Sequence, residues 1–424
     1  MKLLVEGAPL RGTVEIPGSK SHTIRAVAIA SLAKGKSVIE APLESSDGLA
    51  AFHAYRAFGV PIESVNGAWH VEGLGGHFEA PANIIDVGNS GTTMLIALGS
   101  AALLGSGLSV LTGDEQVRRR PVGPLVKALN DLGAKARCTR DNGCPPVVVE
   151  GRIKGGRCTI EAMTSQYITA LLINGPLADG DIDLDVPLLH EKPYVGITLD
   201  WLKRHGVKVT YAEDYSSFHI PAGQAYQPVH QRIPGDFSSA TFFLAAGALQ
   251  DNEVFSHGLD MGDSQGDKAV VEYLGAMGAE VSVEAAGVRV RAKRLVGTEI
   301  DLNATPDALP MMAALACFAK GTTRLVNVPQ ARLKETDRIA TMRMELCKMG
   351  AHIEELEDGL VIHESAMRPA EVDGHGDHRI VMSLAIAGSM LPGTTTINGY
   401  EAVNVTYPTF LDALHGLGGK GRVV

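Results

Sequence analysis

The chain repeats one pattern six times: a helix-like segment ends at a glycine, and an alternating, strand-like segment follows. The interval between copies is roughly 70 residues, which indicates a repeated structural unit. Each of these glycines is expected just past a helix end, where a positive φ angle is needed and glycine adopts it without strain. The glycines are Gly59, Gly133, Gly206, Gly278, Gly350 and Gly418.

A second element recurs: an Ala- and Leu-rich helix, a short turn and a strand, as in residues 30–40, 318–327 and 390–397. Together the two elements predict six copies of a unit with two helices and several strands. A chain of 424 residues exceeds what one core usually fills, so three units per domain are expected. We predict one domain over 15–228 and another from 1–14 with 229–424. A fold of class α/β follows, with apolar helices inside a ring of sheets and small molecules bound in the cleft between domains.

The composition of the chain argues against several classes of partner and binding site. A net charge of −10 argues against a nucleic-acid partner, although a local basic site for small anions stays possible. Five cysteines without a C-x-x-C pair indicate neither a disulfide framework nor a zinc site, and favour the cytoplasm. The first residues resemble a strand rather than a signal peptide, and the apolar runs are too short for a membrane span. We therefore expect a cytoplasmic monomer without metal or cofactor.

Charged and glycine-rich stretches point to anionic substrates. Residues 332–338 and 377–379 concentrate Arg, Lys, Asp and Glu, and Arg forks bind carboxylate and phosphate groups bidentately. Residues 17–25 and 88–94 are turns that open helices, where backbone N–H groups face an anion. Three arginines precede Pro121, which is expected to begin a helix. Further candidates are the helix starts at 164–166, 235–239 and 305–308. Each stretch alone is also explained as a helix cap, a tight turn or a salt-bridged surface.

Read together, the stretches resemble the enolpyruvyl transferase family over nearly the whole chain. The matching segments are 17–25, 88–92, 111–121, 165–166, 236–240, 334–338 and 377–379. The resemblance implies two similar domains, each of three βαβαββ units, in an inside-out α/β barrel. It also implies transfer of the carboxyvinyl group of phosphoenolpyruvate to the 5-hydroxyl of shikimate 3-phosphate, in aromatic amino acid and chorismate biosynthesis, without a cofactor.

The resemblance carries roles to particular residues. Those implied to bind phosphoenolpyruvate are Lys20, Gly91, Arg120 and Gln166 at its phosphate, and Arg338 and Arg379 at its carboxylate. Those implied to bind the acceptor are Ser21, Arg25, Thr164, Ser165, Gln166, Tyr194, Asp307 and Lys334. The implied catalytic groups are Asp307, which accepts the hydroxyl proton, and Glu335 with Lys20, which protonate the methylene carbon.

Some positions depart from the family pattern. Glu191 lies where many members place a serine on the acceptor's phosphate, so it either turns outward, pairs with Lys192, or marks a different acceptor. The other departures are Leu95, Gln330 and Val405. Two alternatives therefore stay open: a sister enolpyruvyl transferase with a different, non-phosphorylated cyclic alcohol as acceptor, and a non-catalytic binding protein. The cell-wall branch of the family is disfavoured because Ser21 replaces its asparagine and the loop at 113–120 lacks its cysteine.

Overall fold

A computed structural model describes residues 1–424, and these form two compact units. One unit consists of Met1–Ser19 with Pro234–Val424, and the other is the continuous segment Lys20–Ile233. That they are also the functional domains, with the boundaries expected from the sequence after residues 14 and 228, stays a proposal. No helix has both the length and the apolar composition needed to cross a bilayer.

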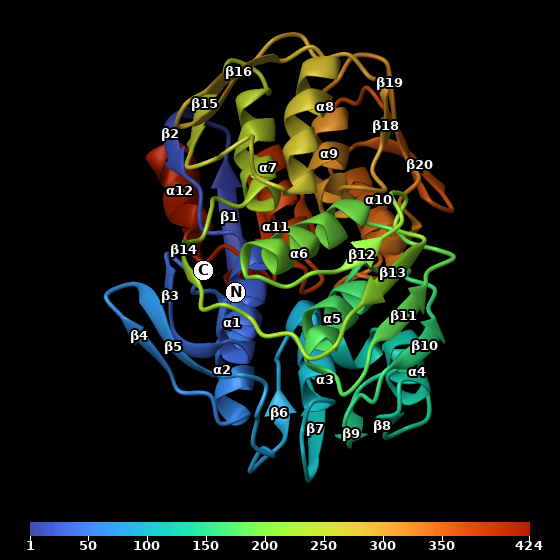
Figure 1. The fold of residues 1–424 in the computed structure, drawn as a ribbon. Coiled ribbons are helices and arrows are strands. Elements are labelled where there is room, and N and C mark those ends of the chain that lie inside the picture. The colour runs from blue at the N-terminus through green and yellow to red at the C-terminus, as the bar shows by residue number, and fades with distance from the viewer. The chain divides into compact units, whose positions relative to one another are not determined.

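Lys20–Ile233, drawn from blue to yellow-green in Figure 1, holds three sheets of four strands. Its elements are α1 (Lys20–Leu32), β3 (Lys34–Glu40), α2 (Ser46–Ala57), β4 (Ile62–Val65), β5 (Ala68–Leu74), β6 (Ile85–Asp86), α3 (Gly91–Ala101), β7 (Leu108–Thr112), η1 (Val117–Arg119), α4 (Gly123–Asp131), β8 (Lys135–Cys138), β9 (Val147–Glu150), β10 (Gly156–Thr159), α5 (Gln166–Asn174), η2 (Gly175–Leu177), β11 (Ile182–Asp185), α6 (Lys192–Arg204), β12 (Thr210–Tyr211), β13 (Ser217–Ile220) and β14 (His230–Arg232).

The other unit also holds three sheets of four strands. Its elements are β1 (Lys2–Glu6), β2 (Arg11–Glu15), α7 (Phe237–Gly247), β15 (Glu253–His257), η3 (Gly266–Ala269), α8 (Val270–Ala276), β16 (Glu280–Glu284), β17 (Gly287–Arg291), β18 (Glu299–Asp301), η4 (Pro306–Ala308), α9 (Leu309–Ala316), β19 (Thr322–Val326), η5 (Pro329–Leu333), α10 (Arg338–Lys348), β20 (His352–Leu356), β21 (Gly359–His363), β22 (Glu371–Asp373), α11 (His378–Gly388), β23 (Thr394–Asn398), η6 (Tyr400–Val405), α12 (Phe410–Gly416) and β24 (Lys420–Val423).

One repeat shows the common plan. In β6, α3, β7, α4, β8 and β9, the first two strands pair in parallel across α3, and the later pairs are antiparallel. The same order recurs in β10 to β13 and in β18 to β21. The predicted α/β class with three repeats per unit is confirmed. The six sheets remain separate, so the inside-out barrel is a set of helices covered by sheets rather than a closed sheet.

Three strands depart from chain order. β2 supplies the first strand of the repeat that continues with α7 and β15, and β14 supplies the first strand of the repeat that contains α1 and β3. β1 pairs with both β23 and β24, at the opposite end of the sequence. The chain passes from one unit to the other at two places, after residues 19 and 233. The segments at these two places also pair, because Gly18 and Gly235 form an antiparallel bridge. The N-terminal strands are therefore integral parts of the unit completed by the C-terminal residues.

The first helix of each repeat is almost wholly buried. All residues of α7, α9 and α11 are buried, and each unit has one contiguous hydrophobic core. These helices are rich in Ala, Leu, Ile, Met and Phe, so most of their surface can pack against neighbouring apolar groups. The second helix of each repeat is amphipathic, as in α4, where only Leu125, Ala128 and Leu129 are buried.

The six repeat glycines end these second helices, and all have a positive φ angle, between +84° and +99°. After α8, for example, the Gly278 N–H donates to Gly275 O and the Ala279 N–H donates to Leu274 O, both at 3.0 Å. These are the two bonds of a Schellman motif, which satisfies carbonyls at a helix end. The helix stop expected from the sequence is confirmed.

Pro121, in contrast, does not begin a helix: α4 starts at Gly123, with Pro124 in its first turn.

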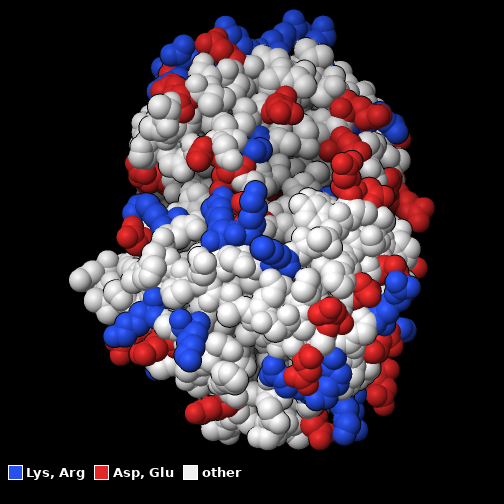
Figure 2. Space-filling view, in the orientation of Figure 1, with Lys and Arg blue, Asp and Glu red and all other residues white.

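Charged side chains lie mainly on the exposed faces of the sheets and second helices. The face in Figure 2 carries Lys and Arg interspersed with Asp and Glu. A ladder on β15 to β17 is typical: Arg289 pairs with Glu253 and Glu284, and Arg291 pairs with Glu253 and Glu280. Exposed pairs of this kind contribute little to stability. The charged groups that demand an explanation are the buried ones.

Candidate functional site

In Lys20–Ile233, the buried helices are open to solvent only at their N-terminal ends. On α1, α3 and α5 every residue is buried except Lys20, Ser21, Thr92 and Gln166. A helix N-terminus carries unsatisfied N–H groups and a partial positive charge, so it favours anions. The sequence-predicted residues of this unit thus lie at the ends of helices that are suited to bind phosphate or carboxylate.

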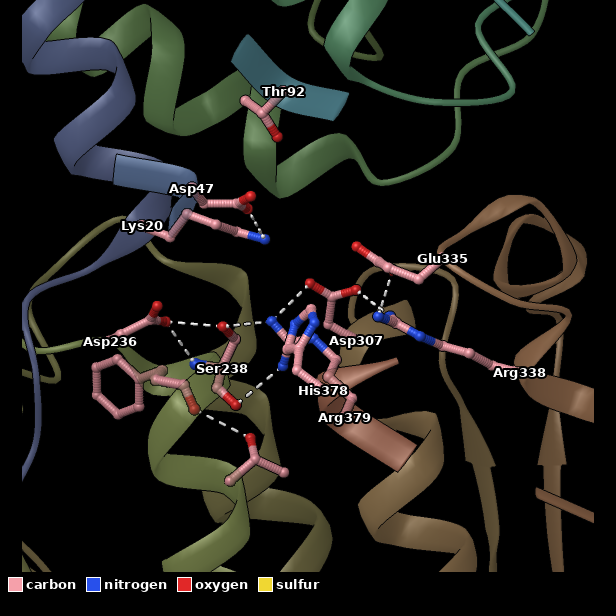
Figure 3. A network of polar contacts seen from close by, with 12 residues as sticks. Lys20, Asp47, Thr92, Asp236, Ser238, Asp307, Glu335, Arg338, His378 and Arg379 are labelled. Atoms are coloured by element: carbon pink, nitrogen blue, oxygen red, sulfur yellow. Dashed lines mark hydrogen bonds and ion pairs between the residues drawn. The ribbon is translucent and has the colours of Figure 1, made fainter. Parts of the chain in front are cut away.

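Lys20 is paired with a carboxylate that the sequence analysis missed. Its Nζ lies 3.2 Å from Oδ2 of Asp47, in the first turn of α2, and both side chains are largely buried (Figure 3). The buried carboxylate fixes the direction of the ammonium group. A Ser-x-Asp pattern at the start of a helix signals a cap, but it does not reveal the long-range partner.

Gly91 and Arg120 form a second feature of this unit. A methyl group added to Gly91 would collide with Nη1 of Arg120, so only glycine lets the guanidinium lie against the start of α3. Beside it, the Gln166 amide donates to the Thr92 hydroxyl at 3.1 Å. Arg120, Gly91 and Gln166, which were predicted together, are associated with the N-terminal ends of α3 and α5.

Arg25 is buried, with only 2% of its surface exposed, yet its hydrogen-bond partners are neutral groups. The guanidinium donates to the Thr198 and Thr169 hydroxyls and to the carbonyls of Ser21 and Tyr194, at 2.9 to 3.3 Å. Burial lowers its pKa to about 10. A buried cation held by neutral dipoles is stabilised further by an anion, so Arg25 is a strong candidate for a substrate carboxylate.

Glu191 turns inward, contrary to the suggestion that it faces solvent. Its side chain is 2% exposed, and Oε2 accepts hydrogen bonds from the Thr164 hydroxyl, the Ser165 hydroxyl and the Ser165 N–H, at 3.0, 3.0 and 3.1 Å. Its backbone is left-handed, with φ at 58°. The expected pairing with Lys192 is replaced by contacts with residues at the start of α5, since the side chain of Lys192 is exposed.

In the other unit, aspartates cap the helices that carry the arginines. The carboxylates of Asp337 and Asp377 accept from backbone N–H groups at the starts of α10 and α11. This places Arg338 and Arg379 in the first turn of their helices. Asp236 caps α7 in the same way and also accepts from the Ser238 hydroxyl at 2.8 Å. Because each cap fixes the residue at which its helix begins, it also fixes the backbone position of the arginine in the first turn.

Arg338 is the centre of a buried ionic network. Its guanidinium donates to the carboxylates of Asp307 at 2.8 Å and of Glu335 at 2.6 Å (Figure 3). It also donates to the carboxylate of Asp377 at 2.8 Å. Arg338 is 1% exposed and Asp377 is fully buried. Burial alone would lower the pKa of Arg338, but the three carboxylates outweigh it and raise the pKa above its ordinary value. The group is therefore a permanent cation.

Arg379 belongs to the same network. Its Nη2 lies 3.0 Å from Oδ2 of Asp307 and donates to the Ser238 hydroxyl, and its Nη1 donates to the Ser238 carbonyl. The two oxygens of Asp307 thus join two arginines that are distant in sequence. Asp307 lies in the first turn of η4, directly before α9, so its carboxylate combines a position at a helix start with the contacts to both arginines.

Among the remaining candidates, Lys334 and Tyr194 are half-buried. Ser238, which the sequence analysis did not single out, is the neutral partner of Arg379; its position one residue into an Asp-capped helix gave no indication of that contact. Gln330 is buried and donates to the Asn303 carbonyl at 3.0 Å, and Leu95 is buried on α3. Both departures from the family pattern are therefore buried side chains.

One group of side chains has the composition of a metal site. His352, Glu354 and His363 place their ligand atoms within 4.8 Å of one another on β20 and β21. His352 and Glu354 are exposed, and none of the three belongs to the networks described above. The group carries no role in the argument that follows.

Comparisons with a family model, with known relatives and with solved structures all give the same family. Residues 4–414 match the family model described as EPSP synthase (3-phosphoshikimate 1-carboxyvinyltransferase). A 3-phosphoshikimate 1-carboxyvinyltransferase of Acetivibrio thermocellus is 54% identical, covering 99% of this chain and 98% of the relative. One from Ruminiclostridium cellulolyticum is 51% identical over the full length of both chains. A solved EPSP synthase of Acinetobacter baumannii superposes with a TM-score of 0.83 at 28% identity, covering both chains completely.

Proposed function

Since the chain belongs to the EPSP synthase family, we infer that it transfers the carboxyvinyl group of phosphoenolpyruvate to the 5-hydroxyl of shikimate 3-phosphate and releases phosphate. It is a transferase of the shikimate pathway, which leads to the aromatic amino acids. The observation that supports this chemistry best is the pair Arg338 and Arg379, two buried cations joined by the carboxylate of Asp307.

The arginine pair suits the carboxylate of phosphoenolpyruvate. Guanidinium groups bind a carboxylate bidentately, and both arginines start helices whose N-terminal ends also favour an anion. Lys20, Arg120 and Gln166, with the backbone at Gly91, serve the phosphate in our proposal. Ser21 and Arg25 serve the acceptor's carboxylate, Lys334 its ring hydroxyls, and Thr164, Ser165 and Tyr194 its phosphate.

Asp307 is the proposed general base. Both of its oxygens accept from arginines. A substrate carboxylate that binds Arg338 and Arg379 competes with Asp307 for them and frees an Asp307 oxygen to accept a proton. Asp307 then takes the proton of the 5-hydroxyl as the hydroxyl oxygen forms a bond to C2 of phosphoenolpyruvate.

Glu335 is the proposed acid. It lies 2.6 Å from Nη2 of Arg338, with a side chain 7% exposed, and its proton goes to the methylene carbon as the C–O bond forms. The tetrahedral intermediate carries a new methyl group and still holds phosphate. Glu335 then removes a proton from that methyl group while phosphate leaves, and Asp307 passes the hydroxyl proton to the leaving phosphate. This restores the double bond, the acid and the base. Lys20 neutralises the developing charge.

The test is direct. Purified protein is mixed with phosphoenolpyruvate and shikimate 3-phosphate, phosphate release is followed, and the product is identified by mass. We expect Asp307→Asn and Glu335→Gln to lower kcat by about 10²- to 10⁴-fold, the usual contribution of a general acid or base. Asp301→Asn, an exposed carboxylate on β18, is the control and should leave kcat unchanged. Full activity in both variants would refute the catalytic assignment.

A sister transferase with a non-phosphorylated acceptor is the second candidate, because Glu191 occupies donors that we assign to the acceptor's phosphate. Turnover with such an acceptor and none with shikimate 3-phosphate would favour it. Binding of both substrates without turnover would favour a binding protein. A cytoplasmic location and a monomeric state belong to the same proposal, and the five free cysteines are in keeping with a reducing compartment.

A further inference from the structure

Glu191 is an anion at the position that would attract a phosphoryl group. The start of α5 offers one backbone N–H from Ser165 and the hydroxyls of Thr164 and Ser165, all within 3.1 Å of Oε2 of Glu191. Hydroxyl and N–H donors at a helix N-terminus are the groups that bind phosphate oxygens. In this structure the carboxylate of Glu191 accepts from all three donors.

The carboxylate and a phosphoryl group cannot both be accommodated without cost. Both carry negative charge, both need the same donors, and Glu191 is 2% exposed, so water screens the repulsion poorly. Buried carboxylates seek donors, and one that loses them is strongly destabilised. A phosphorylated acceptor therefore binds only after Glu191 has left the Thr164 and Ser165 donors, whereas a hydroxyl group can donate to the carboxylate in place.

The backbone at Glu191 provides a way for the side chain to leave. The residue is left-handed, with φ at 58°, a conformation unfavourable for a side chain of this size. Glu191 immediately precedes α6, and its side chain makes no capping hydrogen bond to that helix. The helix that carries Tyr194 does not depend on the carboxylate, so the side chain can change rotamer without unwinding α6.

Resting on the function proposed above, we propose that Glu191 is a specificity-determining residue of the acceptor site. Its carboxylate acts as an internal competitor of the acceptor's phosphoryl group. It weakens binding of the phosphorylated cyclic polyol and reduces discrimination against the same polyol with a free hydroxyl.

The test uses Glu191→Gln, which keeps the shape and removes the charge. We expect the KM for shikimate 3-phosphate to fall about tenfold or more, because a like charge is removed from a buried site. The KM for phosphoenolpyruvate should stay the same. The ratio of kcat/KM for shikimate 3-phosphate to that for shikimate should rise by a similar factor. Glu161→Gln, an exposed glutamate in the segment before Thr164, is the matched control and should change neither value.

A purely structural role predicts something else: a lower melting temperature with an unchanged or higher KM for shikimate 3-phosphate, and that result would overturn the proposal. Should Glu191→Gln fail to fold, Glu191→Asn gives a second test, since asparagine tolerates the left-handed backbone. If neither variant folds, Glu191 is a structural cap and the proposal is wrong. Inactivity of the wild type with both acceptors would instead refute the proposed function.

Discussion

Buried charges in this protein occur in networks that satisfy several atoms at once. Glu345 on α10 is fully buried, and its carboxylate accepts from Lys348 at 2.7 and 2.8 Å, from the His375 ring at 2.8 Å and from the Asp373 N–H at 2.9 Å. Burial alone would raise the pKa of Glu345, but these partners outweigh it and lower the pKa below its ordinary value of 4.5. The group therefore stabilises the fold in its ionised form.

Replacing Glu345 by Gln should lower the free energy of unfolding at pH 7 by about 1–3 kcal/mol, because buried donors lose their charged acceptor. The folded pKa lies below the unfolded one, so this stabilisation is complete above about pH 4.5 and is lost as the pH falls through the folded pKa. Urea unfolding of both proteins from pH 7 to pH 3 measures the difference. Exposed Glu357→Gln is the control, and a difference independent of pH would contradict the assignment.

Among single residues, local sequence patterns predicted helix-capping positions better than they predicted long-range hydrogen-bond and ion-pair partners. Asp236 and Asp377 each precede an apolar helix, and that pattern was enough to identify a capping position. The bond from Asp307 to Arg338 and Arg379 joins three separate segments, which no local pattern encodes. Asp47 and Ser238 were missed for the same reason. Glu191 was recognised only as an anomaly, because its direction depends on the packing of α5 and α6.

At the level of elements, the repeat was readable because each copy needs the same helix stop. A Schellman motif requires a left-handed residue, and glycine supplies it without the steric penalty of a Cβ atom. The periodic glycines therefore revealed six helix ends, all with positive φ. The order of strands within a sheet was not readable, since pairing partners lie far apart in the chain and side-chain alternation does not identify a neighbour.

Gly275, within α8, and Gly278, just past its end, test whether the helix stop depends on the φ angle. Gly278→Ala, at φ +99°, should lower the free energy of unfolding by about 1–2 kcal/mol through left-handed strain. Gly275→Ala, inside α8 with nothing within 4 Å of an added methyl group, should be neutral or stabilising by up to about 1 kcal/mol. Thermal or urea unfolding of the two variants gives the comparison. Equal effects would show that the φ angle at position 278 is not what constrains the residue.

At the scale of the whole molecule, the two units differ in continuity. All strands of the three sheets in Lys20–Ile233 come from that one segment. The other unit needs two segments, because β1 lies between β23 and β24 and β2 pairs with β15. The number of repeats, and a unit built from both ends of the chain, were predicted from the sequence. The pairing partners of β1, β2 and β14 were not, since these segments resemble ordinary short strands.

Residues 20–233 expressed alone should therefore fold cooperatively, with a sigmoidal unfolding transition by circular dichroism. Residues 234–424 alone should not, because their sheets lack the central strand β1 and the edge strand β2. Addition of a peptide of residues 1–19 should restore a transition in the second fragment. A cooperative transition of 234–424 without the peptide would show that β1 and β2 are dispensable.

The position of β1 between β23 and β24 also sets an order of events during translation. Residues 2–6 leave the ribosome long before their partners in β23 and β24, which are made some 390 to 420 residues later. At about 5–20 residues per second, β1 waits on the order of tens of seconds with its backbone groups unpaired. The segment 20–233 is completed within that interval and can fold first. The earliest strand is thus among the last to be incorporated, and it is exposed to chaperones and to mispairing for most of the synthesis of the chain.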